Sequence, residues 1–354
     1  MEKLSAKRRG ILALAAGFIL ASCGESHLPW TGKRYFSMDT WVSVQTSAAK
    51  DSGLDEAFLA KENDAIGAIF DQVNNYADAT APHDVVSVYD INKAEAPIEI
   101  GEGLHQLLSF SLRMQQETAG YFNPLCGALA DLWKWGLRHA RTDGTNRIPD
   151  PQIPVEADID EALISLRNSS LILGERNGKK TAFLSRPSGR ELTRAKLDLG
   201  GIAKGYAAEI ARKKLKEDGV RHYLVNGGNS SILFGENIAK DGYFSMGWAE
   251  DLPGYRINAK NVVVGTSSVS VQGQEIDGVV YSHIVNPFTG EAAPALTGVT
   301  LLGSDAGILD ALSTALIWAP EGKREELERK FDLKAVYYKD KQVIANHDFP
   351  LLAQ

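Results

Sequence analysis

The stretch Leu197-Asp198-Leu199-Gly200-Gly201-Ile202-Ala203-Lys204-Gly205-Tyr206 is the part of the chain around which the rest is organised. A short apolar run with one carboxylate meets a glycine pair, and residues 203–215 then have the apolar spacing of a helix. Glycines let backbone N–H groups approach an anion, Lys204 adds a positive charge, and a helix start adds a partial one. This layout indicates phosphate binding. The alternative is a plain glycine turn between a strand and a helix, with Lys204 in solvent.

The glycine spacing fits neither the dinucleotide fingerprint nor the P-loop, so another nucleotide-binding solution is needed. The run LDLGGIAKGYA closely resembles the signature of the ApbE family, the FAD:protein FMN transferases that attach FMN to a Ser or Thr of a partner protein. The resemblance implies that Asp198 and Lys204 contact FAD.

Two positions near the start of the chain extend this resemblance. Met38-Asp39-Thr40 resembles the family motif M-[GD]-T, in which the methionine lies against the flavin. Tyr76 stands where the family has a flavin-contacting tyrosine, and segment 84–92 loosely resembles the element that follows it. An isolated methionine before a strand is otherwise usually a core residue, so Met38 counts only together with the other motifs.

Segment 120–136, GYFNPLCGALADLWKWG, resembles the longer family pattern G-x-[FM]-D-P-T-x-G-P-L-[VI]-x-L-W-x-[FW]-G. By that resemblance Tyr121, Phe122 and Asn123 contact the cofactor. Asn123 replaces the usual Asp, and Leu125 replaces Thr. An amide can both donate and accept a hydrogen bond but carries no charge, so hydrogen bonding to the flavin or ribityl chain is retained and a charge-dependent role is not.

Segment 281–290, YSHIVNPFTG, is similar to the family element Y-[SGT]-H-I-[IL]-[DN]-P-x-T-G. A lone histidine is usually a structural or surface residue, but His283 lies inside this ten-residue match. Because an unperturbed imidazole titrates near pH 6.5, it can move a proton at neutral pH. We therefore predict that His283 is catalytic and also contacts FAD.

A metal site is indicated by the segment 304–317, in which Asp305 is a natural N-cap and a helical apolar stripe follows it. Asp310 and Thr314 lie four residues apart and so share one face of the helix. A carboxylate and a hydroxyl are oxygen ligands suited to Mg²⁺, with substrate phosphates completing the shell. The alternative is a simple hydrogen bond on the helix surface. In the family this pattern carries the metal ligands, together with a backbone carbonyl that here belongs to Gly201.

The composition is that of a globular protein: 354 residues, 44% hydrophobic, 23% charged, with a net charge of −7. A mildly acidic chain has no electrostatic footprint for nucleic acid. The resemblance implies a single α+β domain over residues 34–354, with a mixed β-sheet core, surrounding helices and FAD in a cleft. Periodicity and turn residues predict helices, a loop and two hairpins: helices at 58–76, 104–118 (ended by Gly120), 159–167, 203–215, 305–317 and 323–330; a loop at 138–154; hairpins at 171–184 (around Asn177-Gly178) and 335–345.

The N-terminus has the pattern of a targeting segment, residues 1–22, with basic residues before an apolar run at 11–20. Leu20-Ala21-Ser22-Cys23 resembles a bacterial lipobox, which implies cleavage before Cys23 and acylation of its thiol, followed by a tether through residue 33. We therefore expect a protein anchored at the periplasmic face of a membrane in a bacterial envelope. The alternative is plain secretion. Cys126 is the one other cysteine, so neither a disulfide nor a structural zinc site is expected.

The expected reaction is Mg²⁺-dependent transfer of FMN from FAD to a Ser or Thr hydroxyl of an exported redox protein, with release of AMP. This is attack on a pyrophosphate phosphorus, so positioning and charge neutralisation should dominate catalysis. Two alternatives remain open: a flavin-binding lipoprotein without transferase activity, and a Mg²⁺-dependent pyrophosphatase that splits FAD into FMN and AMP.

Overall fold

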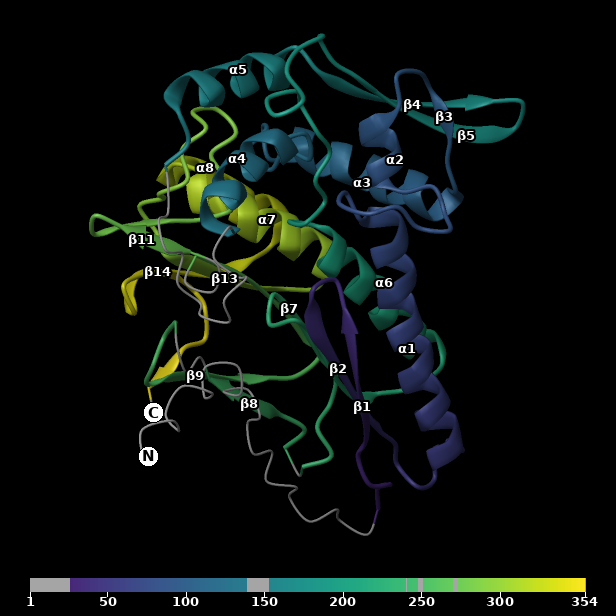
Figure 1. Ribbon diagram of the computed structural model, residues 1–354. Helices are drawn as coiled ribbons and strands as arrows, with labels where there is room; N and C mark the ends of the chain where they lie inside the picture. The colour runs from purple at the N-terminus through teal and green to yellow at the C-terminus, as the bar shows by residue number, and fades with distance from the viewer. Residues whose placement is uncertain (1–25, 139–152, 240, 248–250, 270–272, 354) are drawn as a thin grey trace, which may run out of the picture.

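An eight-stranded sheet lies at the centre of the computed structural model (Figure 1). The structure describes residues 26–138, 153–239, 241–247, 251–269 and 273–353. In sheet order the strands are β1 (Thr31–Ser37), β2 (Thr40–Ser47), β6 (His222–Gly227), β7 (Ser231–Phe234), β10 (Val262–Ser268), β13 (Gly298–Gly303), β14 (Lys334–Lys339) and β15 (Gln342–His347). Each neighbouring pair in this order is antiparallel.

Side chains alternate along each strand, and the central strands contribute to a hydrophobic cluster on each face of the sheet. On β14, Ala335 and Tyr337 belong to one hydrophobic cluster, whereas Val336 and Tyr338 belong to the other. The two tyrosines are among the largest fully buried side chains. The sheet is therefore the middle layer of the molecule.

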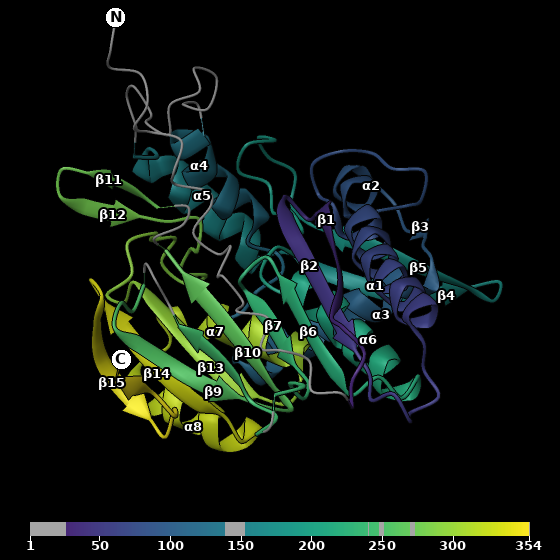
Figure 2. The same ribbon diagram turned by 90° about the horizontal axis from the view of Figure 1, so that it is seen from below.

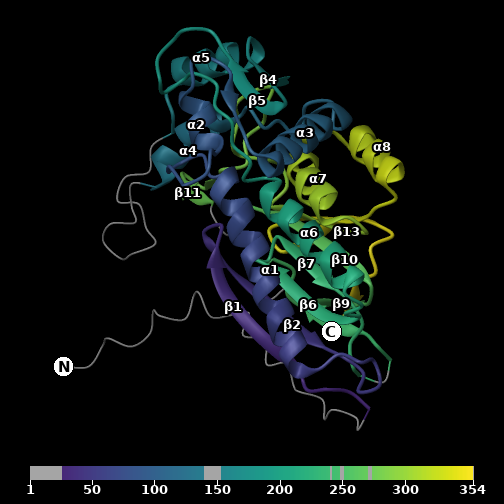
Figure 3. The ribbon, with the colours of Figure 1, turned by 90° about the vertical axis from the view of Figure 1, so that its right-hand side faces the viewer.

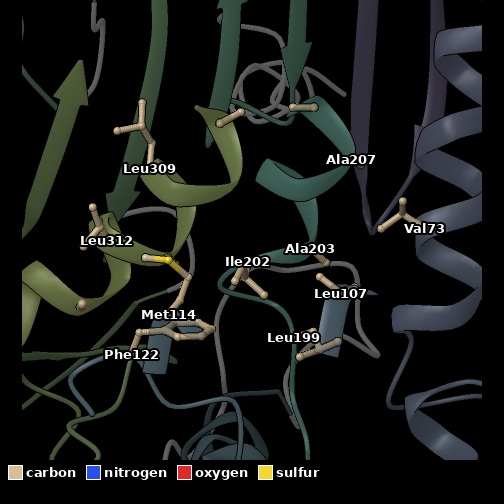
Figure 4. Packing of buried hydrophobic residues seen from close by; sticks show 14 of the residues in the cluster. Val73, Leu107, Met114, Phe122, Leu199, Ile202, Ala203, Ala207, Leu309 and Leu312 are labelled. Carbon is tan, nitrogen blue, oxygen red and sulfur yellow. The ribbon is translucent and has the colours of Figure 1, made fainter. Parts of the chain in front are cut away.

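Helices cover the first face of the large sheet, which is the face whose cluster includes Ala335 and Tyr337 (Figure 3). α1 packs against β1 and β2, α6 against β6 and β7, and α7 against β10 and β13. Figure 4 shows part of the cluster beneath them, including Met114, Phe122, Ile202 and Leu312. The helices of the described residues are α1 (Glu56–Ala77), α2 (Val88–Lys93), α3 (Glu102–Glu117), α4 (Gly127–Arg138), α5 (Glu156–Arg167), α6 (Ala203–Glu217), α7 (Ala306–Trp318) and α8 (Glu321–Phe331).

Smaller sheets complete the fold (Figure 2). The sheet β16-β9-β8 supplies Phe244 and Ile257 to the cluster on the second face of the large sheet. A second three-stranded sheet, β3-β5-β4, lies near α2, and β11-β12 is a separate hairpin. Their bounds are β3 (Ile98–Glu99), β4 (Ser170–Arg176), β5 (Lys179–Ser185), β8 (Phe244–Gly247), β9 (Tyr255–Ala259), β11 (Gln274–Ile276), β12 (Val279–Tyr281) and β16 (Leu352–Ala353).

The α+β class and the single sheet-based domain are confirmed, and so are the predicted helices and hairpins, with ends that differ by a few residues. One refinement is that every ladder of the large sheet is antiparallel; parallel pairing within the described residues is confined to isolated bridges. The predicted loop lies mostly outside the described residues, as does the targeting segment with Cys23. Among the helices that are described, none is both long and apolar enough to cross a membrane.

The prediction that Gly120 caps α3 was wrong in its position. Thr118 is the C-cap, and the left-handed residue that follows it is Ala119, with φ of 52°; Gly120 is the next residue, with φ of 86°. Gly120 N donates to Gln115 O at 2.8 Å and Ala119 N donates to Gln116 O at 3.0 Å, the two hydrogen bonds of a Schellman motif.

Candidate active site

A cleft of about 330 Å³ lies where several segments distant in sequence meet. One wall is the turn between β1 and β2, with Ser37 and Met38; another is the end of α1. The remaining walls come from α4, with Lys134, and from the stretch that includes Asp198 and Lys204. The size is at the lower end of the usual range for small-molecule sites.

Backbone pairing holds the Asp198 stretch against the chain just before α4. Gly127 N donates to Lys196 O and Asp198 N donates to Pro124 O, both at 2.9 Å. Asn92 fixes the next peptide from the other side: its Nδ2 donates to Leu197 O at 2.9 Å, and its Oδ1 accepts from Leu197 N at 2.8 Å. Two of the sequence motifs are thus joined directly at the cleft.

Lys134 and Asp198 form the central ion pair of the cleft, with 2.8 Å between Nζ and Oδ2. Gly200 N donates to the other carboxylate oxygen at 2.7 Å. The Lys134 ammonium is the main cause that holds the pKa of Asp198 well below its ordinary value, against the opposing effect of burial. The charge of His283 acts in the same direction on the pKa of Asp198.

Asp131 is a second carboxylate of the cleft, and its pKa shifts in the opposite direction from that of Asp198. Burial raises the pKa of Asp131, although Lys134 and Lys196 partly offset this effect. The Lys196 ammonium lies 3.6 Å from Asp131 Oδ2. The cleft therefore contains lysines and carboxylates that are paired across α4 and the Asp198 stretch.

The three predicted metal ligands converge where the start of α6 crosses α7. Asp310 is buried, which raises the pKa of its carboxyl group, and Oδ2 accepts a 2.8 Å hydrogen bond from Gly205 N. A Cβ on Gly205 would lie 2.2 Å from Ala306 O, so this glycine serves the close approach of the two helices rather than contact with a ligand. Thr314 Oγ1 donates to Asp310 O at 3.2 Å. Gly201 packs on Thr314, since a Cβ there would lie 3.0 Å from Oγ1.

These groups are a carboxylate, a hydroxyl and a backbone carbonyl, so the donor set fits a hard cation such as Mg²⁺. Among the described residues, no group of three or more His, Cys, Asp or Glu side chains is arranged to hold a metal. The predicted site differs from such a cluster, because it has one carboxylate together with a hydroxyl and a backbone carbonyl. Substrate phosphates would supply the further oxygen ligands.

The segment that carries His283 is held by two tryptophans. The Trp133 ring stacks on Tyr281 at 5.2 Å between centroids, and its Nε1 donates to Gly290 O at 2.8 Å. On the other side, Trp318 Nε1 donates to Ile284 O at 3.2 Å. Trp133 is buried and fixes both ends of this loop. The side chain of Trp135 lies outside the described residues.

The structure brings some predicted site residues into the cleft and places others elsewhere. Met38, Asp198 and Lys204 line it. Tyr76 lies in the core beside Gly103, and Phe122 is buried beneath the helices. Tyr121 packs edge-on against Phe288 at 5.0 Å, and Asn123 Oδ1 accepts from Leu125 N at 3.0 Å, so Asn123 shapes the turn before α4. His283 is not among the residues that line the cleft. For all of these residues, contact with a ligand stays a prediction.

Sequence reasoning missed Asn92, Asp131 and Lys134 as site residues. Asn92 ends the loosely matched segment 84–92, which was a weak signal. Asp131 and Lys134 occupy positions that the family pattern leaves unspecified, so nothing in the motif marked them.

These observations define the class of the protein: it has an α+β fold with a charged cleft at the start of a helix. The ApbE family model matches residues 38–337, and the chain therefore belongs to the ApbE family.

Named relatives and a solved structure agree with this assignment. A Haemophilus influenzae protein named FAD:protein FMN transferase is 25% identical over 339 residues, covering 93% of this chain and 91% of that protein. A Rhodobacter capsulatus protein of the same name is 24% identical over 332 residues, which is 92% of this chain but 59% of that protein. The structure of the Pseudomonas stutzeri flavinyl transferase ApbE, in its apo form, has a TM-score of 0.67 at 19% identity and covers 92% of this chain and 96% of that one, which supports the fold.

Proposed function

We propose that this protein transfers FMN from FAD to a Ser or Thr hydroxyl of an acceptor protein and releases AMP. The observation that carries the proposal is the convergence of three motifs at one cleft: the turn with Met38, the motif at 120–136 that includes α4, and the stretch with Asp198 and Lys204. The names of the family relatives support the same reaction.

In this reaction the acceptor oxygen attacks the phosphorus of the FMN half of FAD. The new P–O bond replaces the bond to the AMP phosphate, and AMP leaves. Lys204 and the start of α6 line the cleft and would stabilise negative charge on the diphosphate. His283 accepts the proton of the acceptor hydroxyl, which is otherwise a weak nucleophile. Asp198, kept ionised by Lys134, stabilises the imidazolium that results.

We further propose that Asp310, Thr314 and the Gly201 carbonyl hold Mg²⁺. The buried carboxyl group supports this, because a bound cation would stabilise the charge that burial opposes. When bound, the ion would offset the negative charge of the diphosphate.

The test is to incubate the purified protein with FAD, Mg²⁺ and a candidate acceptor, then denature the mixture and measure flavin fluorescence on the acceptor. Fluorescence that remains with the acceptor, together with an equal amount of AMP, supports the proposal. FMN and AMP released in solution, with an unlabelled acceptor, would identify a pyrophosphatase instead. FAD that binds but stays intact would identify a flavin-binding protein.

We also propose that Cys23 is the acylated N-terminal residue of the mature protein and anchors it at the periplasmic face of a membrane. The lipobox-like tetrapeptide before the tether supports this. Mass spectrometry of the protein from membranes should find a lipid on Cys23, and Cys23→Ala should move the protein into the soluble fraction. An unmodified Cys23 in the wild-type protein would refute the anchor.

A further inference from the structure

Ser37 has a buried hydroxyl without a hydrogen-bond partner in the described part of the chain. The residue is 4% exposed, and yet it lines the cleft. An unpaired buried hydroxyl destabilises the folded protein, and most such groups in proteins are paired with protein or water. An unpaired hydroxyl at the wall of a ligand-binding cleft indicates that the bound ligand is its hydrogen-bond partner.

The backbone holds Ser37 in a defined position. It is the last residue of β1 and pairs with Thr40, so that Met38 and Asp39 form a two-residue turn. Both turn residues have positive φ, 53° and 57°, which is the geometry of a type I′ hairpin. Such a turn follows the twist of its strands and is short, so it presents Ser37 at a fixed place on the cleft wall.

The surroundings of Ser37 favour a flat ring over a phosphate. The anion-binding groups of the cleft, Lys204 and the start of α6, come from a different wall. Phe36, the residue before Ser37, also lines the cleft, and 63% of it is exposed. Phe36 packs edge-on against Trp41 with 5.5 Å between the ring centroids, so its orientation is held.

We infer that Ser37 is a further substrate-binding residue, whose hydroxyl forms a hydrogen bond with the polar edge of a heteroaromatic ring of FAD. A serine hydroxyl can donate one hydrogen bond and accept others, so it matches the nitrogen and carbonyl edges of such rings. This inference rests on the proposed function, because FAD supplies the ring. Both the flavin and the adenine have this chemistry, and the experiment distinguishes them.

The chain offers a matched control in Ser231, on β7 of the same sheet. Its hydroxyl is also buried and has no hydrogen-bond partner within the described residues, but it is not among the residues that line the cleft. Ser37→Ala and Ser231→Ala therefore remove the same group from similar surroundings, and only the first removes it from the cleft.

The measurements are the dissociation constants of FAD, FMN and ADP by calorimetry, and the urea midpoint of each protein without ligand. Ser37→Ala should weaken FAD binding about threefold to tenfold, the worth of one net hydrogen bond. Its urea midpoint should be unchanged or higher, since an unpaired buried hydroxyl is removed. Ser231→Ala should behave in the same way in urea and bind FAD as the wild type does. A matching loss for FMN places the contact at the flavin, and one for ADP places it at the adenine.

Unchanged FAD affinity in Ser37→Ala would overturn the inference while leaving the proposed function intact. A lower urea midpoint, with affinity lost to a similar degree in Ser231→Ala, would also overturn it, because the role would then be structural. If Ser37→Ala does not fold, Ser37→Cys keeps the volume with a much weaker hydrogen-bonding group and should show the same loss of affinity. A wild-type protein that binds no FAD with Mg²⁺ present would instead refute the proposed function.

Discussion

The ammonium of Lys134 lies 2.8 Å from the carboxylate of Asp198, although 64 residues separate the two in the sequence. Both side chains are mostly buried, with 19% and 25% exposed. The lysine comes from α4 and the aspartate from the stretch that leads into α6, so the pair connects two of the motifs that form the cleft. It also keeps the carboxyl group of Asp198 ionised.

Lys134→Met should destabilise the protein by about 1–3 kcal/mol at pH 7, because it leaves the partly buried Asp198 charge without its cation. The lowered pKa of Asp198 contributes stability that is present above its unfolded value, near pH 4, and is lost as the pH falls below it. The difference from the wild type, measured by urea unfolding, should therefore be constant above about pH 5 and narrow in more acid solution.

The control for this prediction is Lys179→Met, which removes an exposed pair with Glu99 and should leave stability unchanged. A gap between Lys134→Met and the wild type that stays constant down to pH 2 would contradict the linkage to Asp198.

Asp310→Ala should abolish AMP release both with and without an acceptor, because either reaction needs the metal. The variant should also lose the Mg²⁺ dependence of FAD binding, measured by calorimetry. Asp305→Asn is the matched control, because Asp305 is the N-cap of the same helix. Asn can still accept the hydrogen bond from Ile308 N that Asp305 accepts at 2.9 Å. Wild-type flavin transfer by Asp310→Ala would show that the metal site is elsewhere.

His283→Ala should reduce transfer by about 10²-fold or more, the usual contribution of a general base, with FAD affinity largely retained. The measurement is the rate of acceptor labelling at saturating FAD, with the dissociation constant of FAD determined separately. A variant that labels at a normal rate once FAD is saturating, but binds FAD poorly, would make His283 a cofactor-holding residue.

Ala119→Gly should raise the free energy of unfolding by about 0.5–1 kcal/mol, since a left-handed backbone is costly for any residue with a Cβ. Gly120→Ala should have the opposite sign: the residue has φ of 86°, and its new Cβ would meet the Phe288 ring at 3.4 Å. Thermal or urea unfolding of the two variants checks the pair. Equal stability of both variants would mean that the cap does not hold this geometry in solution.

Much of the secondary structure could be predicted from the sequence, because its causes are local. The spacing of apolar residues predicts α1 and α7, Asp305 accepts the predicted capping hydrogen bond, and Asn177-Gly178 forms the predicted turn. The placement of Asp310 and Thr314 on one helix face followed from the same periodicity. Resemblance added the family, which the match over residues 38–337 confirms.

Only the tertiary structure decided which side chains meet at the cleft. Lys134 and Asn92 reach Asp198 and Leu197 from elements remote in sequence, and no local pattern records such a contact. The missing Cβ of Gly205 is explained by helix α7, which becomes its neighbour only on folding. The physical reason is that periodicity and turn chemistry act over a few residues, whereas burial, ion pairing and pKa depend on what the folded chain places next to each group.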